Sequence, residues 1–312
     1  MGKTRIAILG STSHIAKGLI YHFLQDKYPI LHLYTRSPDK LHSFLETIGK
    51  PSNRRCMTHK GYKNFMKFPY EVIINCIGVG TLRKKGSYSD YFMVGEEYDN
   101  LVIRYLKNIC ADTLYISFSS GAIYGRKFKV PADKDTKNCI PVNHVTKEDY
   151  YAISRINAEA KHRSFKEFNI VDLRIFSYFS RFIDLTDGYF ITELLKSILE
   201  NRVFLVDNTN FVRDYLHPKD LYSMIQKCMD IGKINDAFDV MSSQPVEKKE
   251  ILDYFSSHYG LKYKIDYSLK YFSPTGMKNV YYSRYDKAAK IGYKPLFSSM
   301  DTIKQEAKYI LL

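Results

Sequence analysis

The first half of the chain alternates short apolar runs with amphipathic stretches, and this alternation limits the folds that the chain can adopt. Four apolar runs are rich in β-branched and aromatic residues, as buried parallel strands are. They lie at residues 5–10, 30–35, 71–78 and 114–120. Residues 13–26 and 98–110 carry apolar side chains at three- and four-residue spacing, which is typical of helices. The alternation predicts a parallel sheet with helices on both faces, extended by a strand at 170–176.

The last third of the chain, from about residue 178, is more irregular and rich in tyrosine. Helices are predicted near residues 189–200, 247–258 and 301–311. Open α/β sheets bind ligands at the carboxyl edge of their strands, and we expect this part to pack over that edge. The predicted fold class is therefore α/β, a doubly wound parallel sheet of the Rossmann type with a smaller C-terminal lobe.

Length and cysteine usage exclude several classes of protein. The 312 residues suit one large α/β unit or two closely packed lobes, and no run of 18 apolar residues predicts a membrane span. The apolar N-terminal run ends in a glycine turn, which favours a first strand over a targeting signal. The five cysteines are widely spaced and form no C-x-x-C motif. They predict free thiols in a reducing cytoplasm, with no metal site and no disulfide framework.

The chain is strongly basic, with 47 Lys and Arg against 33 Asp and Glu and a net charge of +14. Such a charge suits nucleic acid, an anionic membrane surface or a phosphate-bearing small molecule. The basic residues are scattered, however, and the clusters at 83–86 and 247–250 are short. This pattern favours ordinary solvated surface, and then an anionic metabolite. We expect neither a nucleic acid nor a membrane as partner.

The turn after the first predicted strand, "GSTSHIA", has the spacing of a phosphate-binding loop. Such a loop needs a tight turn, close approach of its backbone to the phosphates, and close packing of the helix on the strand. Only Gly10 is a glycine here, and Ser13 and Ala16 occupy the other two positions. Both are small, and Ser13 could donate its hydroxyl to a phosphate. Small residues are also common in ordinary strand-to-helix turns, so the loop alone is weak evidence.

The second predicted strand ends in Thr35, Arg36 and Ser37. A site for NAD usually has an acidic residue at this point, which binds the ribose 2′-hydroxyl. A cation between two hydroxyls suits a 2′-phosphate instead, and so favours NADP. The alternative interpretation is an ordinary polar loop.

Two further stretches carry groups that could handle protons. Ser120 ends a buried strand and could hydrogen-bond a substrate oxygen, although the same stretch could be a plain strand end and turn. In "YAISRINAE", Tyr151 is followed four residues later by Arg155, where a known catalytic pattern has lysine. Arg155 lies one helical turn away on the same face, whereas the neighbouring Tyr150 would be matched with the uncharged Ser154. An active pair, an inactive copy and a chance match all remain open at this point.

The order of these stretches along the chain resembles a known family. After the glycine turn come "VIINCIG", "FSSGAIYG", "YAISRINAE", "LRIFSYF", "VRDYLHPKDL", "AFDVMSSQPVEKKEIL" and "DKAAKIGYKP". Together they resemble the extended short-chain dehydrogenase/reductases, and more narrowly the NAD-dependent epimerase/dehydratase family, which acts on nucleotide-diphosphate sugars. The resemblance runs from about residue 5 to residue 311.

The resemblance implies roles for single residues. Ser120 would orient the reacting oxygen of the sugar, and Tyr151 would transfer its proton. Arg155 replaces the family's lysine; it keeps the positive charge, but it cannot lose its proton and its planar fork meets ribose hydroxyls differently. Arg213 would bind the substrate's diphosphate, and Ser177 stands where the family has a substrate-binding asparagine. The family's dimers imply a homodimer that pairs helices at about 93–110 and 148–167.

The resemblance also implies a cofactor site and a division into domains. The cofactor-binding residues are predicted to be Gly10, Ser13, His14, Ile15, Ala16, Thr35, Arg36, Ser37, Asn75, Gly78, Tyr151 and Arg155. The expected cofactor is NADP, with NAD as the alternative. Residues 1–177 would form a dinucleotide-binding domain to which 205–230 return, and residues 178–312 would be mostly a substrate-binding lobe.

The residues after Ser120 narrow the reaction. Family dehydratases have an Asp–Glu pair there, whereas this chain has Gly121 and Ala122, so dehydration is not expected. The leading hypothesis is a C4 ketoreductase or dehydrogenase of a nucleotide-diphosphate sugar, in deoxysugar or surface-polysaccharide biosynthesis. A C4 epimerase is the alternative within the enzymes. A non-catalytic NADP-binding sensor is the alternative of another class.

Overall fold

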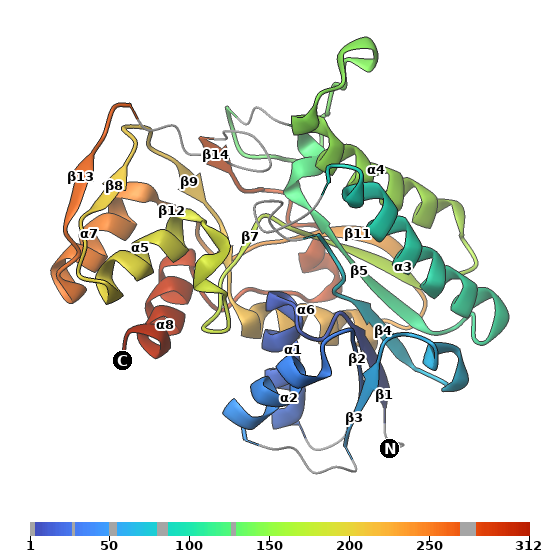
Figure 1. Cartoon of the computed structure of the whole chain (residues 1–312). Coiled ribbons are helices and arrows are strands. Elements are labelled where there is room, and N and C mark those ends of the chain that lie inside the picture. The colour runs from blue at the N-terminus through green and yellow to red at the C-terminus, as the bar shows by residue number, and fades with distance from the viewer. Residues whose placement is uncertain (1–3, 27–28, 50–54, 80–86, 126–128, 269–278) are drawn as a thin grey trace.

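A parallel sheet of seven described strands forms the centre of the molecule (Figure 1). The computed structural model describes residues 4–26, 29–49, 55–79, 87–125, 129–268 and 279–312, so the basic cluster at 83–86 lies outside them. The strands are β1 (Arg5–Leu9), β2 (Ile30–Thr35), β3 (Cys56–Lys60), β4 (Val72–Asn75), β5 (Leu114–Ser120), β6 (Ile170–Ile175) and β11 (Asn235–Val240). Their order is β11-β6-β5-β4-β1-β2-β3. The order reverses between β1 and β4, which is the point where open α/β sheets bind ligands.

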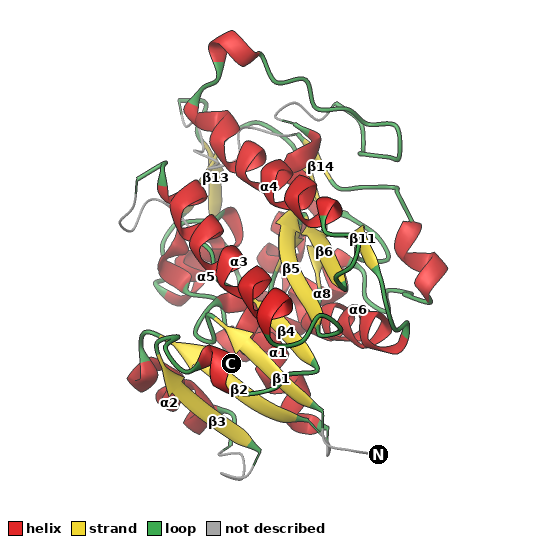
Figure 2. Ribbon diagram, turned by 90° about the vertical axis from the view of Figure 1, so that its right-hand side faces the viewer, coloured by secondary structure: helices red, strands yellow, loops and turns green. Residues whose placement is uncertain are grey.

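Helices cover both faces of this sheet (Figures 1 and 2). One face carries α1 (His14–Gln25), α2 (Pro38–Thr47) and α6 (Pro218–Asp230), and the other carries α3 (Asp90–Asn108) and α4 (Lys147–Ser164). In β1, Ile6 and Ile8 belong to the core on the side of α1 and α6, whereas Ala7 and Leu9 belong to the core on the side of α3. Because both faces are covered, the strand is apolar throughout and does not alternate. The predicted doubly wound α/β fold is confirmed.

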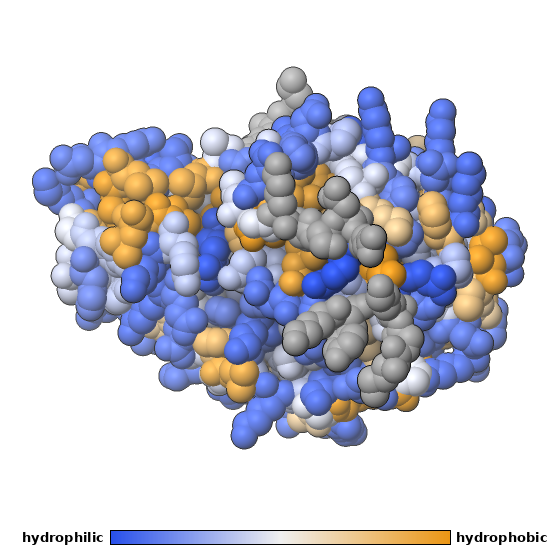
Figure 3. Space-filling view, turned by 90° about the horizontal axis from the view of Figure 1, so that it is seen from below, coloured by the Kyte–Doolittle hydropathy of each residue, from blue (hydrophilic) through white to orange (hydrophobic). Residues whose placement is uncertain are grey.

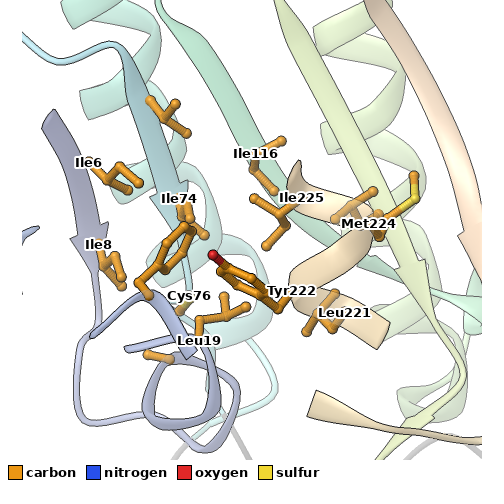
Figure 4. Close-up of a cluster of buried hydrophobic side chains, with 14 of the residues drawn as sticks. Ile6, Ile8, Leu19, Ile74, Cys76, Ile116, Leu221, Tyr222, Met224 and Ile225 are labelled. Atoms are coloured by element: carbon orange, nitrogen blue, oxygen red, sulfur yellow. The ribbon is translucent and has the colours of Figure 1, made fainter. Parts of the chain in front are cut away.

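The larger core lies between the sheet, α1 and α6 (Figure 4). Ile8 of β1 and Ile116 of β5 meet Leu19 of α1 and Leu221 and Ile225 of α6, and all five side chains are fully buried. Helix α6 therefore packs on the main sheet, and β11 joins it by pairing with β6. Two late segments of the chain thus return to the main sheet. The predicted domain boundaries themselves remain a prediction.

The other C-terminal elements form a smaller layer beside the carboxyl edge of the sheet, at the left of Figure 1. Their helices are α5 (Phe190–Leu199), α7 (Lys248–Tyr259) and α8 (Ser299–Leu311). Their strands are β7 (Ser177–Tyr178), β8 (Phe204–Val206), β9 (Val212–Arg213), β10 (Tyr215–Leu216), β12 (Val246–Glu247), β13 (Tyr263–Ile265) and β14 (Val280–Tyr281). A separate core around Phe179, Leu194 and Phe255 holds the three helices together with β8, β10 and β12. Figure 3 views the molecule from below: most of this face is hydrophilic, and apolar residues gather over this lobe.

Two predicted boundaries were wrong by several residues. Helix α3 begins at Asp90 and not at 98, because Asp90 accepts the Ser87 N–H at 2.8 Å and Tyr91 is buried. These contacts outweigh the cost of Gly95 inside the helix, about 1 kcal/mol. Strand β4 ends at Asn75 and not at 78, because the Asn75 side chain accepts the Ile77 N–H at 3.1 Å and turns the chain.

A buried ion network holds α3 and α4 on the sheet. The fully buried His162 donates through Nδ1 to Asp172 at 2.9 Å and through Nε2 to Asp99 at 2.7 Å. Lys161 pairs with Asp99, and Arg163 pairs with Asp172 at 2.8 Å. Burial opposes a charge on His162, but the hydrogen bonds and charges of the two aspartates outweigh it and raise the pKa of the imidazole to about 9.

This network predicts that the free energy of unfolding falls as the pH rises from about 6.5 to about 9. The pKa of His162 is raised from 6.5 to about 9, so the folded state binds the proton more tightly than the unfolded state. The contribution is complete below pH 6.5 and is lost as the pH rises through 9, by at most about 1.4 kcal/mol per pH unit. Denaturant unfolding in pH steps across this range measures the slope.

The groups that face the imidazole are Asp99, Asp172, Lys161, Arg163 and Tyr115. Burial opposes the charge on Asp99, yet His162 and Lys161 lower the pKa of its carboxyl to about 2, and burial raises the pKa of Tyr115, so neither titrates in this range. His162→Gln should therefore flatten the slope. An unchanged slope in that variant would show that another group causes it.

Candidate active site

A cavity of about 780 Å³ opens at the carboxyl edge of the sheet, between the switch point and the C-terminal lobe. The turns after β1, β2 and β4 line one side, and residues of β7, β9 and β14 line the other. Its volume is in the range of sites for organic ligands. Every predicted site residue except Ala16 lines this cavity.

The turn after β1 requires glycine at its first position. Gly10 has a φ of +71°, and a Cβ there would lie 2.9 Å from the Ile77 side chain and 3.0 Å from the Cys76 carbonyl oxygen. The Ser13 hydroxyl caps α1 by accepting the Ala16 N–H at 3.3 Å, and it also hydrogen-bonds the Cys76 thiol. The N-terminus of α1 thus opens on the cavity, as phosphate sites require.

The other residues of this turn have different surroundings. Ala16 is fully buried in the core, where its small side chain allows α1 to pack closely on the sheet. His14 lines the cavity, with Nε2 2.8 Å from the Ser180 hydroxyl, and burial lowers the pKa of its imidazole to about 4. The ring is therefore neutral at pH 7. Ile15 adds an apolar contact to the cavity wall.

Thr35, Arg36 and Ser37 follow β2 and line the same end of the cavity. Thr35 is buried, and its hydroxyl accepts the Ser37 N–H at 3.0 Å, which fixes the loop. Arg36 is exposed, and among the described residues no carboxylate forms an ion pair with it. Its guanidinium can therefore meet an anion of a ligand.

Asn75 and Gly78 form the wall after β4. The Asn75 amide donates to the Tyr115 hydroxyl at 3.2 Å, which ties this turn to the network around His162. A Cβ on Gly78 would have Arg155 Nη2 as its described neighbour, at 3.8 Å. The turn after β4 and the helix α4 therefore meet at Arg155.

Ser120, Tyr151 and Arg155 lie at the sheet end of the cavity. The Arg155 guanidinium lies over the Tyr151 ring, 5.2 Å from its centroid, and Nη1 donates to the Phe118 carbonyl oxygen at 3.2 Å. The buried Arg155 Nε has no hydrogen-bond partner in the described structure. Ser120 ends β5, and its Oγ accepts the Ala122 N–H at 3.2 Å. The structure thus brings a hydroxyl, a phenol and a fixed cation to one wall.

Tyr150 is not part of this wall. Its ring contacts those of Tyr88 and Phe92, with centroids 6.1 and 6.2 Å away, and it does not line the cavity. The one-residue offset between Tyr150 and Tyr151 therefore turns their side chains to different sides of α4.

Arg213 brings a second cation to the cavity, on the side of the lobe. Its guanidinium lies 4.6 Å from the Phe211 ring centroid, and Nη1 donates to the Val212 carbonyl oxygen at 3.1 Å. Burial lowers the pKa of Arg213, and among the described residues no carboxylate neutralises it. A cation that is taken from water without an anionic partner is costly, so this position favours an anionic ligand. Ser177 of β7 lines the same side.

Sequence reasoning missed several cavity residues from distant parts of the chain. Tyr281 of β14 lies next to Ser120, with the two hydroxyl oxygens 3.0 Å apart. Lys248 belongs to the cluster at 247–250 that was interpreted as solvated surface, yet its side chain is buried. Its Nζ donates at 2.6 Å to Asp207 Oδ1 and at 2.9 Å to the Thr209 carbonyl oxygen, which fixes the loop before Arg213.

The described residues contain no cluster of three or more His, Cys, Asp or Glu that could hold a metal ion. None of the described helices combines the length and the hydrophobicity that are needed to cross a bilayer. All five cysteines are free thiols, and the cellular compartment remains a prediction.

The sheet order, the glycine turn and the cavity at the switch point define a Rossmann-type α/β protein. The chain belongs to the NAD dependent epimerase/dehydratase family, whose model matches residues 6–240. The resemblance that the sequence motifs suggested is thereby confirmed. A search of curated proteins gave no match.

Solved structures with this fold are similar over nearly the whole chain. UDP-glucuronic acid 4-epimerase from Bacillus cereus, in complex with UDP-glucuronic acid and NAD, has a TM-score of 0.79 at 17% identity, covering 98% of this chain and 99% of its own. UDP-N-acetylglucosamine 4-epimerase from Methanobrevibacter ruminantium gives 0.79 at 16%, covering 100% and 99%. dTDP-glucose 4,6-dehydratase from Bacillus anthracis, in complex with NAD, gives 0.74 at 14%, covering 98% and 96%. At these identities the likeness shows the fold alone.

Proposed function

We propose that this chain is an NAD(P)-dependent oxidoreductase that acts on C4 of a nucleotide-diphosphate sugar, as a ketoreductase or dehydrogenase with net turnover of the cofactor. The observation that carries the proposal is one cavity that combines the Gly10 turn, the Ser120–Tyr151–Arg155 wall and Arg213, a cation that pairs with no carboxylate of the described residues. These parts suit a dinucleotide, a reacting alcohol and a diphosphate, respectively. Solved structures of this fold contain NAD and UDP sugars, which is consistent with the proposal.

The residues at the switch point fit a dinucleotide. Glycine at position 10 allows the turn after β1 to lie close to Cys76 and Ile77, and the N-terminus of α1 supplies N–H donors. Arg36 would meet a 2′-phosphate, and Asn75 and Gly78 would line the path towards Arg155. When bound, the nicotinamide dinucleotide supplies the hydride acceptor or donor.

The chain's own residues would handle the proton. The Tyr151 hydroxyl would give a proton to the C4 oxygen during reduction, or accept one during oxidation. Arg155 would keep a fixed positive charge beside the phenol, and Ser120 would hold the C4 oxygen by a hydrogen bond. Arg213 would hold the diphosphate at the other end of the cavity, so that the sugar is fixed between them.

The test is an assay of the purified protein with NADPH and a panel of 4-keto nucleotide sugars. Net reduction lowers the absorbance of the reduced nicotinamide and yields a 4-hydroxy sugar that mass spectrometry detects. The proposal fails if 4-keto sugars bind but the cofactor is never consumed.

A C4 epimerase is the second candidate, and Arg155 is the observation that favours it. An epimerase returns to the sugar the proton that it removed, so it needs no exchange with water during the cycle. A guanidinium cannot release a proton, and it is therefore better suited to such a closed cycle than to a proton relay. The same assay separates the candidates when 4-hydroxy nucleotide sugars are added to the panel, because epimerisation inverts C4 of such a sugar at constant cofactor absorbance. A non-catalytic sensor would give neither signal.

Arg36 predicts the choice of cofactor. The protein should bind NADPH about tenfold more tightly than NADH, and Arg36→Ala should remove most of this preference, because one charged hydrogen bond is lost. Calorimetric titration of both cofactors measures the two affinities. Lys40→Ala changes an exposed cation of the adjacent helix and serves as the control. Equal affinities in the parent protein would overturn the assignment.

The assembly and the domain roles follow from the same proposal. The main sheet with α6 and β11 would bind the dinucleotide, and the C-terminal elements would bind most of the sugar nucleotide. A homodimer would pair α3 and α4, which lie together on one outer face of the sheet (Figure 2). Contacts between their side chains, such as Asn157 to Glu96 at 3.3 Å, would fix the two helices as one surface.

A further inference from the structure

The contacts along the cavity place its residues in order from the reacting wall to the C-terminal lobe. The Tyr281 hydroxyl oxygen lies 3.0 Å from Ser120 Oγ, and the Tyr281 ring centroid lies 5.8 Å from the Arg213 guanidinium. On its other side, Arg213 lies 4.6 Å from the Phe211 ring centroid. Ser120, Tyr281, Arg213 and Phe211 therefore follow one another along the cavity, and all four line it.

Lys248 extends this order from Phe211 to Asp207. Its backbone N–H donates to the Phe211 carbonyl oxygen at 2.9 Å, and its Nζ donates to Asp207 Oδ1 at 2.6 Å. Asp207 and Lys248 also line the cavity. In a nucleotide-diphosphate sugar the diphosphate separates the sugar from the nucleoside. With the sugar at Ser120 and the diphosphate at Arg213, the base would therefore lie on the side of Phe211 and Asp207.

The polar groups at this end of the cavity offer a free acceptor. The three hydrogens of Lys248 Nζ are all used, by Asp207 Oδ1 and by the carbonyl oxygens of Asp207 and Thr209. Asp207 Oδ1 also accepts the Thr209 N–H at 3.3 Å. Asp207 Oδ2, in contrast, is not buried and has no hydrogen-bond partner among the residues that the structure describes. A ligand at this end thus meets a carboxylate acceptor, and Lys248 has no donor left for it.

Phe190 and Phe211 form an apolar wall beside Asp207. Both side chains are half-buried and line the cavity, and their rings are nearly perpendicular with centroids 4.9 Å apart. A flat base can lie against such rings, but this contact does not distinguish one base from another, because every base has a π face. The choice of base therefore depends on the edge that faces Asp207.

We propose that Asp207 selects a nucleotide whose base carries an exocyclic amino group, namely cytosine, adenine or guanine. An amino group donates to a carboxylate oxygen, as cytosine N4 does to Asp or Glu in protein–DNA complexes. Uracil and thymine have a carbonyl oxygen where cytosine has its amino group, and a carboxylate repels that oxygen. The inference rests on the proposed function and goes beyond it, because it names the class of nucleotide.

Calorimetric titration with CDP, ADP, GDP, UDP and dTDP tests the selection. The protein is first saturated with NADPH, so that the dinucleotide site is filled. At least one of the three amino-bearing nucleotides should bind about tenfold or more tightly than UDP and dTDP, because it alone gains a hydrogen bond to a charged acceptor.

Asp207→Asn is the informative variant. It keeps an oxygen for Lys248 and replaces the free acceptor by an amide donor, so it should shift the ratio of affinities towards UDP about tenfold or more. Asp253→Asn changes an exposed carboxylate of the same lobe outside the cavity and should leave the ratio unchanged. The ratio is measured within one preparation and does not depend on the fraction of protein that is folded.

Equal affinities for the five nucleotides would overturn the inference, and would indicate that Asp207 binds a ribose hydroxyl, which all of them carry. Tightest binding of UDP or dTDP would overturn it as well. A preference that persists in Asp207→Asn would assign the selection to another residue. If none of the five binds, the proposed function itself fails, so the two failures are distinguishable.

Discussion

Tyr151→Phe should lower turnover about a thousandfold while leaving NADP(H) affinity nearly unchanged. The substitution keeps the ring that contacts Tyr91 and Arg155 and removes only the hydroxyl that would transfer the proton. Loss of a positioned general acid or base typically lowers the rate by about a hundred- to ten-thousandfold. Steady-state kinetics with an accepted nucleotide sugar, together with calorimetric titration of the cofactor, measure the two effects. Activity close to that of the parent would show that Tyr151 is not catalytic, and the sensor hypothesis would gain support.

Tyr150→Phe is the matched control. Its ring lies between Tyr88 and Phe92 and outside the cavity, so the loss of its hydroxyl should change turnover at most severalfold. A large loss from Tyr150→Phe, with little from Tyr151→Phe, would reverse the assignment of the two tyrosines.

The same assay measures the part that Arg155 plays. Arg155→Met removes the charge beside the Tyr151 ring and the donor to the Phe118 carbonyl oxygen, so both activity and cofactor affinity should fall. Arg155→Lys restores the family's residue and should keep substantial activity, because the charge remains one helical turn from the phenol. A variant with lysine that is as inactive as the variant with methionine would mean that the guanidinium's shape matters more than its charge.

The sequence was sufficient to bring the sheet-side residues of the candidate site together, because they lie where parallel strands end. Gly10 and Ser120 end predicted strands and Arg36 follows one, and the carboxyl ends of parallel strands share one edge. Tyr151 and Arg155 could be paired because a four-residue spacing on a helix fixes their neighbourhood. Both arguments need only short stretches of sequence, because strand ends and a four-residue helical spacing are local features.

The residues that the C-terminal lobe contributes to the cavity could not be predicted from local spacing. Tyr281 reaches Ser120 from 161 positions away, through a two-residue strand with no sequence signature. In the sequence Lys248 resembles an ordinary surface lysine, and only the structure shows that its Nζ donates three hydrogen bonds to Asp207 and Thr209. Strand β3 was not predicted either, because an edge strand such as "CMTHK" is half exposed and has no apolar run.

Arg213 is the other residue whose loss should have a large effect. The side chain is half-buried beside Phe211 and Tyr281, where a guanidinium remains charged even though burial lowers its pKa. Among the described residues, its hydrogen-bond acceptor is the Val212 carbonyl oxygen, which leaves further guanidinium donors for a ligand in the cavity. An anionic group of the ligand would satisfy this capacity.

Arg213→Ala should weaken binding of the nucleotide-diphosphate sugar about a hundredfold, because hydrogen bonds to a buried charge contribute about 1.5–3 kcal/mol. The diphosphate is not the reacting group, so KM should rise while kcat changes little, and cofactor affinity should stay the same. Arg202→Ala is the control, because Arg202 pairs with Glu193 and Glu200 at the surface of the same lobe and outside the cavity. Calorimetric titration of the corresponding nucleoside diphosphate measures the affinity directly. If the Arg213 variant binds it as tightly as the parent does, the diphosphate lies elsewhere in the cavity.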